Sequence, residues 1–255
     1  MQTRNTLPLA GALLGTLLWG ALAWAGDTIR PIDSCGELTA QNQSSFVLVQ
    51  SIYTQGPNCL VIQSSNITID MRGFSIQGGG NGTGILASVP VEGVKISNGF
   101  VRNFAVGISL GGTGNVVENV NVTNNTDTGM FLGASSLVDH AVAQGNYKNG
   151  IVMTTAATIK DSTLRANGNN LDSIGLSVGP GSTVTGNTVW ASIGTGLFAS
   201  SGSTVIGNTV FDSNPGSGMS ILCPSNVQNN TATGNTTGNL FLIGIGCNAV
   251  NNVAP

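Results

Sequence analysis

The sequence predicts an all-β fold, namely a right-handed, single-stranded parallel β-helix (a solenoid) of about nine coils. A glycine followed by an aliphatic residue recurs at steps of roughly 22 residues, and the runs between these pairs are short and β-branched. Only 7% of the residues are charged, while 37 are glycine. A unit of this size with tight bends cannot bury its own apolar face, so the units must stack into one elongated domain.

Each predicted coil has two parts. The glycine–aliphatic pairs mark the first part: Gly84-Ile85, Gly107-Ile108, Gly129-Met130, Gly150-Ile151, Gly175-Leu176, Gly196-Leu197 and Gly218-Met219, with Asn239-Leu240 continuing the series. The second part has two apolar residues five positions apart with polar bend residues between them, which predicts two short strands broken by a bend. It recurs at residues 117–122, 138–143, 159–164, 184–189 and 205–210. A leucine-rich repeat would need a leucine frame that is absent.

The chain is predicted to divide into three segments. Residues 1–25 have the pattern of a secretory signal peptide, with Arg4 before an apolar run and a small-x-small cleavage site before Gly26. The alternative is an uncleaved anchor, since residues 7–25 are just long enough to span a membrane. Residues 26–58 are expected to cap the solenoid, and residues 59–255 to form the repeat domain. We therefore expect an exported protein, periplasmic or extracellular, with no membrane span after signal cleavage.

Export would make the four cysteines disulfide partners. Cys35 and Cys59 are 24 residues apart, and so are Cys223 and Cys247. Because this separation is close to the length of one coil, each pair should lie nearly one above the other, at the strand spacing of about 4.8 Å that a disulfide can bridge. The predicted disulfides are Cys35–Cys59 and Cys223–Cys247, one at each end of the solenoid. No cysteine–histidine cluster has the spacing of a zinc site.

Alignment of the coils also predicts polar ladders at the bends. One column holds Asn125, Asn146, Asn167 and Asn235, with Ser192 and Ser213 between them. A second column holds Asn187, Asn208 and Asn230. Asparagine amides can bond up and down such a stack, so we interpret these residues as structural.

Several segments carry a resemblance to a known superfamily. They are Cys35-Gly36, Cys59-Leu60-Val61-Ile62, residues 66–74, Gly84-Ile85, Ile96-Ser97-Asn98-Gly99 and residues 104–108. Over roughly residues 30–250 the chain resembles secreted bacterial β-helix repeat proteins of the pectate-lyase-like superfamily. The resemblance implies the fold and suggests a polysaccharide partner. It does not select a reaction, because the superfamily holds lyases, hydrolases, epimerases, esterases and adhesins.

Ionisable side chains gather on three successive predicted coils. They are Glu118, Asp139, His140, Lys160 and Asp161. By resemblance to β-helix polysaccharide lyases, Lys160 would be the base, and Glu118 and Asp139 would hold Ca²⁺. Arg165 or His140 would be the auxiliary acid. The alternative is a solvated column of opposite charges with no catalytic role. The motifs of polygalacturonases and of mannuronan epimerases are absent.

Aromatic side chains suggest a binding surface. Trp190 and Phe211 follow inward-pointing valines, 21 residues apart, so both are expected to point outward on adjacent coils. Arg165 is predicted to lie in the same column one coil earlier, and Arg102 belongs to the same predicted substrate-binding set. Aromatic rings beside a guanidinium suit sugar rings or a protein partner. The alternative is that an outer loop covers both rings.

The sequence thus favours an exported protein that binds or presents to polysaccharide, with catalysis unproven. The alternative is a lyase acting on uronate polymers, for which Ca²⁺ is the only cofactor that the sequence suggests. A minor alternative is an adhesin or a flat, ice-like binding surface, since threonines such as Thr163, Thr188 and Thr209 stack. With 8 basic against 11 acidic residues and a net charge of −3, the chain lacks the basic patch of a nucleic-acid binder.

Overall fold

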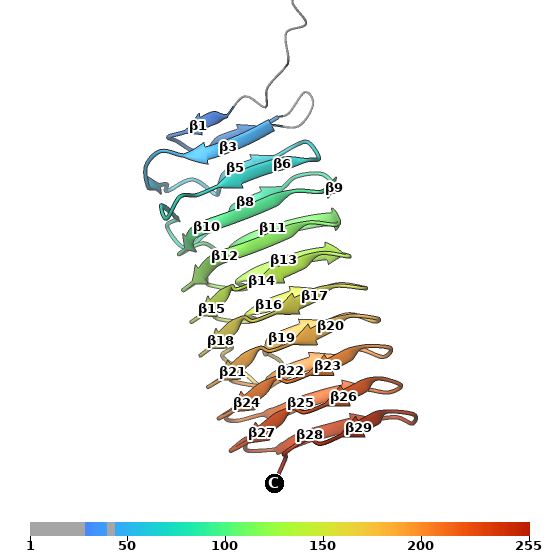
Figure 1. Ribbon diagram of the computed structural model, residues 1–255. Coiled ribbons are helices and arrows are strands. Elements are labelled where there is room, and N and C mark those ends of the chain that lie inside the picture. The colour runs from blue at the N-terminus through green and yellow to red at the C-terminus, as the bar shows by residue number, and fades with distance from the viewer. Residues whose placement is uncertain (1–28, 40–43) are drawn as a thin grey trace, which may run out of the picture.

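A computed structural model describes residues 29–39 and 44–255. Within these ranges the chain forms 29 strands and no helix, and the strands stack into coils along one axis (Figure 1). The predicted signal peptide, residues 1–25, lies outside the described residues. No helix in the described part of the chain has the length and apolarity needed to span a membrane.

The larger of two sheets has 18 strands, and we call it the bent sheet because most coils cross it as two short strands with a bend between them. Its strands are β1 (Arg30–Ile32), β3 (Ser44–Leu48), β4 (Ile52–Tyr53), β6 (Ile67–Asp70), β7 (Ser75–Gln77), β10 (Lys95–Arg102), β12 (Val116–Thr123), β14 (Leu137–Asp139), β15 (Val142–Gln144), β17 (Thr158–Lys160), β18 (Thr163–Arg165), β20 (Thr183–Thr185), β21 (Thr188–Trp190), β23 (Thr204–Ile206), β24 (Thr209–Phe211), β26 (Asn226–Gln228), β27 (Thr231–Thr233) and β29 (Asn248–Val250).

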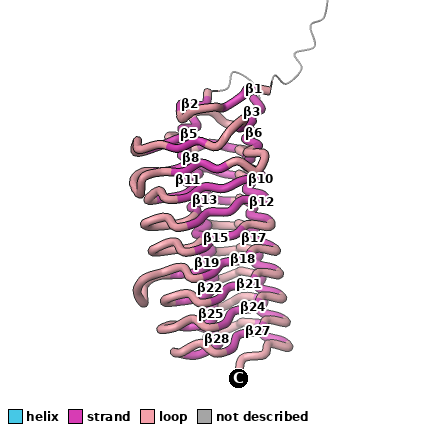
Figure 2. Tube along the Cα trace, turned by 90° about the vertical axis from the view of Figure 1, so that its left-hand side faces the viewer, coloured by secondary structure: helices cyan, strands magenta, loops and turns pink. Residues whose placement is uncertain are grey.

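The second sheet has 11 strands, and we call it the straight sheet. Its strands are β2 (Gly36–Leu38), β5 (Asn58–Ile62), β8 (Thr83–Ala87), β9 (Val91–Glu92), β11 (Val106–Thr113), β13 (Met130–Ala134), β16 (Ile151–Met153), β19 (Ile174–Val178), β22 (Thr195–Ala199), β25 (Ser217–Leu222) and β28 (Gly238–Ile243). Figure 2 shows the strands of successive coils stacked on one another, with the loops projecting beyond them.

Each coil pairs in parallel with the next, as predicted. For example, β14 pairs with β17 and β17 with β20, and β13 pairs with β16, all in parallel register. The straight sheet runs through ten strands from β2 to β28, so the solenoid has about ten turns, one more than the nine that were predicted. The difference arises because residues 30–58 already contribute β1 to β4 to the two sheets. The division of the chain at residue 59 stays a prediction.

The core is a set of apolar ladders that run the length of the interior. The first ladder, in the bent sheet, is fully buried and consists of Ile69, Ile96, Val117, Val138, Ile159, Val184, Val205 and Val227. Burial alternates residue by residue in the short strands, so the neighbours of these residues point outward. Burying each such side chain contributes about 1.5–3 kcal/mol.

The recurring glycine has a steric cause. A Cβ at Gly150 would lie 2.3 Å from the carbonyl oxygen of Gly175 in the next coil, and one at Gly129 would lie 2.5 Å from the oxygen of Gly150. No side chain fits at so close an approach of two backbones, which explains why the repeat returns to glycine at this point of the coil.

The predicted asparagine ladders are confirmed. The Nδ2 of Asn125 donates to Oδ1 of Asn146 at 2.8 Å, and Asn146 donates to Oδ1 of Asn167 at 2.9 Å. In the second column, Asn187 and Asn208 donate to the next coil in the same way, at 3.0 Å each. These bonds satisfy buried polar groups at bends where the sheets leave them unpaired.

Both predicted disulfides are confirmed. Cys35 is bonded to Cys59 with their Cα atoms 4.5 Å apart, and Cys223 is bonded to Cys247 with Cα atoms 4.9 Å apart. Each joins neighbouring coils near one end of the described solenoid. Each closed loop is worth on the order of 3 kcal/mol of stability.

Candidate functional site

The bend of the bent sheet fixes where polar side chains can emerge. The bend residue of each coil has a left-handed backbone, with φ of 53° at Asn119 and 50° at both His140 and Asp161. Glycine takes the same place in two later coils, with φ of 67° at Gly186 and at Gly207. Asparagine, aspartate and histidine tolerate this conformation better than other non-glycine residues, so the bend selects short polar side chains.

A charged column precedes the bend. We use this name for the outward positions Asp70, Ser97, Glu118, Asp139, Lys160, Thr185, Ile206 and Gln228, which are in register from coil to coil. Lys160 Nζ lies 2.7 Å from Asp139 Oδ2, and Lys95 Nζ lies 2.7 Å from Glu118 Oε2. The column therefore brings together the residues predicted as base and metal ligands, but each is already engaged in an ion pair.

The pKa shifts of Lys160 and Asp139 oppose the predicted role of Lys160 as a general base. The hydrogen bond to Asp139 raises the pKa of the Lys160 ammonium, and the same bond holds the pKa of the Asp139 carboxyl below its ordinary value. A general base needs its pKa lowered toward the working pH. The catalytic roles of Lys160, His140 and Arg165 and the Ca²⁺ roles of Glu118 and Asp139 stay predictions, and the ion pairs weigh against them.

Three donors meet where the charged column reaches the bend. Asp139, His140 and Asp161 each offer a ligand atom, and the three atoms lie within 4.8 Å of one another. His140 Nδ1 is 2.5 Å from Asp139 Oδ1. Asp139 is half-buried, while His140 and Asp161 are exposed.

A second outward column follows the bend, and we call it the outer ladder. It consists of Tyr53, Gln77, Arg102, Thr123, Gln144, Arg165, Trp190, Phe211 and Thr233. Trp190 and Phe211 stack with their ring centroids 5.9 Å apart and their planes at 4°, and the guanidinium of Arg165 lies 5.6 Å from the centroid of Trp190. Arg102 shares the column but lies three coils before Arg165, so it is not brought to the rings.

The stacking determines which parts of the Trp190 and Phe211 rings are exposed to solvent. Arg165 covers one face of Trp190 and Phe211 the other, so the half-buried rings present their edges as a narrow apolar ridge. Tyr53, Gln77 and Gln144 are members of the ladder that were not predicted from the sequence. Continuing the coil register beyond Arg102 toward the N-terminus would have found the first two.

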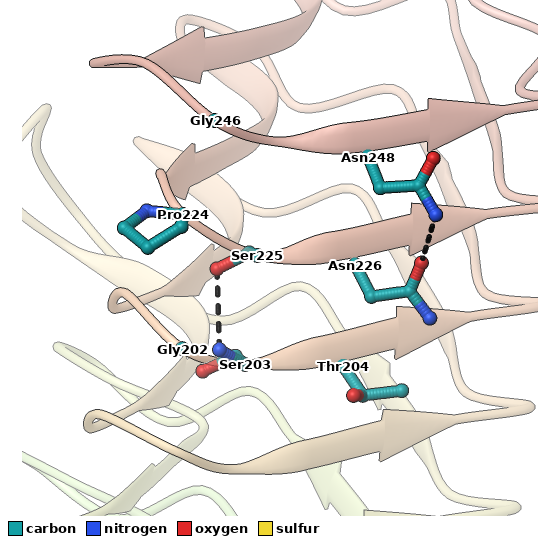
Figure 3. A pocket seen from close by; sticks show the side chains of 8 residues that line it. All are labelled: Gly202, Ser203, Thr204, Pro224, Ser225, Asn226, Gly246 and Asn248. Carbon is teal, nitrogen blue, oxygen red and sulfur yellow. Dashed lines mark hydrogen bonds between the residues drawn. The ribbon is translucent and has the colours of Figure 1, made fainter.

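Two shallow cavities flank these columns. One, of ≈ 410 Å³, lies at the N-terminal end of the outer ladder and is lined by Tyr53, Gln77, residues 78–80, Asn103, Asn124 and Thr126. The other, of ≈ 390 Å³, lies beside β23 and β26 and is lined by Gly202, Ser203, Thr204, Pro224, Ser225, Asn226, Gly246 and Asn248 (Figure 3). Its walls are tied by the hydrogen bond from Asn248 to Asn226, at 3.1 Å. Neither lining contains a carboxylate, an imidazole or a lysine, so neither supplies an acid–base pair.

Comparison with protein families gives one assignment. Residues 45–245 match the family described as "Periplasmic copper-binding protein (NosD)". The chain belongs to the NosD family. No curated protein sequence matches the chain. The periplasmic family and the two disulfides both fit an exported NosD protein.

Solved structures share the fold. The Dettilon tailspike protein (gp208) is similar with a TM-score of 0.55 and 16% identity over 88% of this chain and 61% of its own, so the NosD chain spans less than two thirds of the tailspike. The A-modules of the Azotobacter vinelandii mannuronan C-5 epimerases AlgE6 and AlgE4 each give a TM-score of 0.47, with 14% and 12% identity over 91% and 88% of this chain and 91% and 85% of theirs. The family match and the fold shared with the tailspike confirm the predicted resemblance to β-helix repeat proteins.

The donors of the chain fit copper in one oxidation state. Cu⁺ prefers thiolate and thioether sulfur, whereas Cu²⁺ accepts imidazole and carboxylate. All four cysteines form disulfides. The methionines of the described part of the chain, Met71, Met130, Met153 and Met219, are buried in the core. Among the described residues, Asp139, His140 and Asp161 form the group that could hold a copper ion, and they offer one nitrogen and two oxygens.

Proposed function

We propose that this NosD protein is an exported solenoid that binds an acidic polysaccharide along its outer ladder. The proposal rests on the continuous stack of Arg165, Trp190 and Phe211, which is an apolar ridge with a cation at one end. The apolar ring edges can bury the C–H groups of sugar rings by hydrophobic contact, and a guanidinium suits carboxylates and hydroxyl groups.

The spacing of the coils supports a linear polymer as the ligand. The outer ladder offers one side chain per coil, about 4.8 Å from the next along the axis. Arg102 and Gln144 extend it with hydrogen-bond donors, and Arg102 and Arg165 are the only charged groups in the column. Both charges are positive, so they favour an acidic over a neutral chain of sugars.

Affinity electrophoresis tests the proposal, with polygalacturonate or alginate as acidic polymers and dextran as the neutral control. We expect the acidic polymers to retard the wild-type protein and added salt to weaken the retardation, because arginine contributes through charge. The double variant Trp190→Ala/Phe211→Ala should lose at least about tenfold in affinity, as removal of an aromatic anchor does in other interfaces.

A matched control distinguishes loss of the outer ladder from the general effect of truncating an apolar surface residue. Ile206 lies in the same coil as Phe211 but in the charged column, and it is half-buried like Phe211. Ile206→Ala should retain full affinity. Equal retention of the double variant and wild type would overturn the proposal, and so would retention on dextran that equals retention on the acidic polymers.

A further inference from the structure

Asp139, His140 and Asp161 form a corner of possible metal ligands that the proposed polysaccharide site does not use. His140 and Asp161 occupy the same bend position in neighbouring coils, both with φ of 50°, and Asp139 directly precedes His140. Two consecutive coils thus present three donors at one point of the surface, with their ligand atoms within 4.8 Å of one another. We propose that this corner binds Cu²⁺ in preference to Cu⁺.

The contact between Asp139 and His140 is already close to a chelate. Oδ1 and Nδ1 lie 2.5 Å apart, within hydrogen-bonding distance. Two adjacent ligands on a metal with bonds of about 2.0 Å stand about 2.8 Å apart. A copper ion can therefore bind both atoms after a small separation of the two side chains. A proton carried by Nδ1 would be released to solvent on binding, since His140 is exposed.

The third ligand has room because the next bend residue is glycine. A Cβ at Gly186 would lie 2.6 Å from Asp161 Oδ1, closer than any side chain allows. The following coil repeats this geometry without the contact, since Gly207 has the same φ of 67° and a Cβ there would meet nothing within 4 Å. The same close approach recurs where a Cβ at Gly145 would lie 2.6 Å from Asn124 Oδ1, so a glycine is how this fold makes room for an Asx side chain in the preceding coil.

The oxidation state follows from the donors. One imidazole and two carboxylates are the ligands of Cu²⁺, which binds nitrogen and oxygen sites more tightly than the other divalent first-row metals. In the described part of the chain, the sulfur atoms that would favour Cu⁺ are paired in disulfides or buried in the core, where Met130 is 0% and Met153 2% exposed. The corner is open to solvent, so water can fill the remaining positions on the ion.

Lysine 160 limits the affinity of this site. Its ammonium lies 2.7 Å from Asp139 Oδ2, on the other oxygen of a proposed ligand, and it carries the same sign of charge as the ion. Removing the charge should therefore strengthen binding. We expect Lys160→Met to bind Cu²⁺ roughly tenfold more tightly than the wild type, because Asp139 becomes free and a like charge disappears.

Electron paramagnetic resonance of the full chain, stripped with a chelator and titrated with Cu²⁺, identifies the site. His140 is the only histidine of the 255 residues, so any imidazole nitrogen coupled to the copper can come only from it. We expect one copper per chain with one imidazole nitrogen. His140→Gln should lose that coupling and at least about tenfold in affinity by calorimetry.

Two glycine variants give a matched test of the geometry. Gly186→Ala and Gly207→Ala introduce the same left-handed strain, so both should lose similar thermal stability. Only Gly186→Ala displaces the Asp161 carboxylate. We expect it to weaken Cu²⁺ binding about tenfold, an effect of the size seen when a neighbour of a metal ligand is changed, while Gly207→Ala binds as the wild type does.

Three results would overturn the inference. The first is unchanged copper coupling in His140→Gln, which would place the metal elsewhere, for instance on the amino terminus. The second is equal Cu²⁺ affinity of Gly186→Ala and Gly207→Ala. The third is tighter binding of Cu⁺ than of Cu²⁺, measured by competition with a Cu⁺-selective chelator. None of these measurements involves the polysaccharide, so the copper site and the polysaccharide surface are tested independently.

Discussion

The coils of residues 116–165 and those of residues 174–233 share one backbone and one interior but carry different outer surfaces. Val138 and Val205 occupy the same inner ladder, and both are fully buried. At the outward positions that follow them, the first region has Asp139 and the second has Ile206. A parallel solenoid thus separates two tasks, because inward residues determine the coil while outward residues can change without altering it.

The outer surfaces divide the candidate chemistry between the two regions. The first region holds the ion pair of Asp139 with Lys160 and the donors at the bend, and the second holds the rings of Trp190 and Phe211. Arg165 lies at the border and contacts the first ring of the second region. The proposed copper site therefore lies at the bends of the first region, and the rings of the proposed polysaccharide ridge lie beyond the bend in the second.

The largest effect is expected when a buried leucine is truncated in either region, and the loss of stability should be equal in the two. Leu132 and Leu197 both belong to the straight sheet and are both fully buried, one in each region. Leu132→Ala and Leu197→Ala should each lower the free energy of unfolding by about 2–5 kcal/mol. Denaturant unfolding with the disulfides intact measures both. A difference between them larger than the spread of such substitutions would show that the two interiors are not equivalent.

A smaller effect should distinguish the regions at the buried bend ladder. Asn146 receives two hydrogen bonds from Asn125 and donates to Asn167, whereas the hydroxyl of Ser192 is buried with no partner in the described structure. Asn146→Ala leaves buried groups unpaired and should cost about 1–3 kcal/mol. Ser192→Ala should cost nothing measurable by the same denaturation assay. A substantial loss at Ser192 would reveal a partner for its hydroxyl.

The register of this molecule could be predicted because coil length is nearly constant. Once the glycine–aliphatic pairs were aligned, the same alignment placed Cys35 on Cys59, Asn125 on Asn146 and Trp190 on Phe211, and the structure bears out each contact. Which residues lie one above the other depends on backbone position alone. That is why these pairings follow from a sequence with so few charges.

The remaining features depend on side-chain conformation or on irregular coils. Lys95 is in register with Val116, yet its long side chain crosses to Glu118, which no column alignment indicates. The rings of the outer ladder stack on one another instead of offering their faces, which depends on side-chain torsions. The additional coil escaped prediction because residues 30–58 lack the glycine–aliphatic pair that marks the others.

A gain in stability should follow when the second region receives the ladder of the first. In Ser192→Asn/Ser213→Asn, each new amide can bond to its neighbours, as Asn235 already does to the N–H of residue 213 at 2.9 Å. The glycines at 175 and 196 leave the space that glycines leave beside Asn146 and Asn167. We expect about 1 kcal/mol of added stability, the net value of a hydrogen bond or two. A destabilised double variant would show that the serines compensate for tighter packing.

The smallest effect is expected at the charged column, where Lys160→Ala removes an exposed ion pair. The melting temperature should change by less than about 2 °C at neutral pH, because exposed pairs contribute little. Thr185→Ala, one coil further in the same column, is the control.

The pH dependence gives that small effect a direction. The pair lowers the pKa of Asp139 and raises the pKa of Lys160, chiefly through their hydrogen bond. A carboxyl whose pKa is lowered by folding adds stability above its unfolded pKa of about 4, and this is lost as the pH falls further. An ammonium whose pKa is raised adds stability below its unfolded pKa of about 10.4, and this is lost at higher pH. The difference in melting temperature between wild type and Lys160→Ala should therefore stay level across the neutral range and vanish at both extremes. A difference that grows toward acid pH would mean that Lys160 interacts in the folded protein with a group other than Asp139.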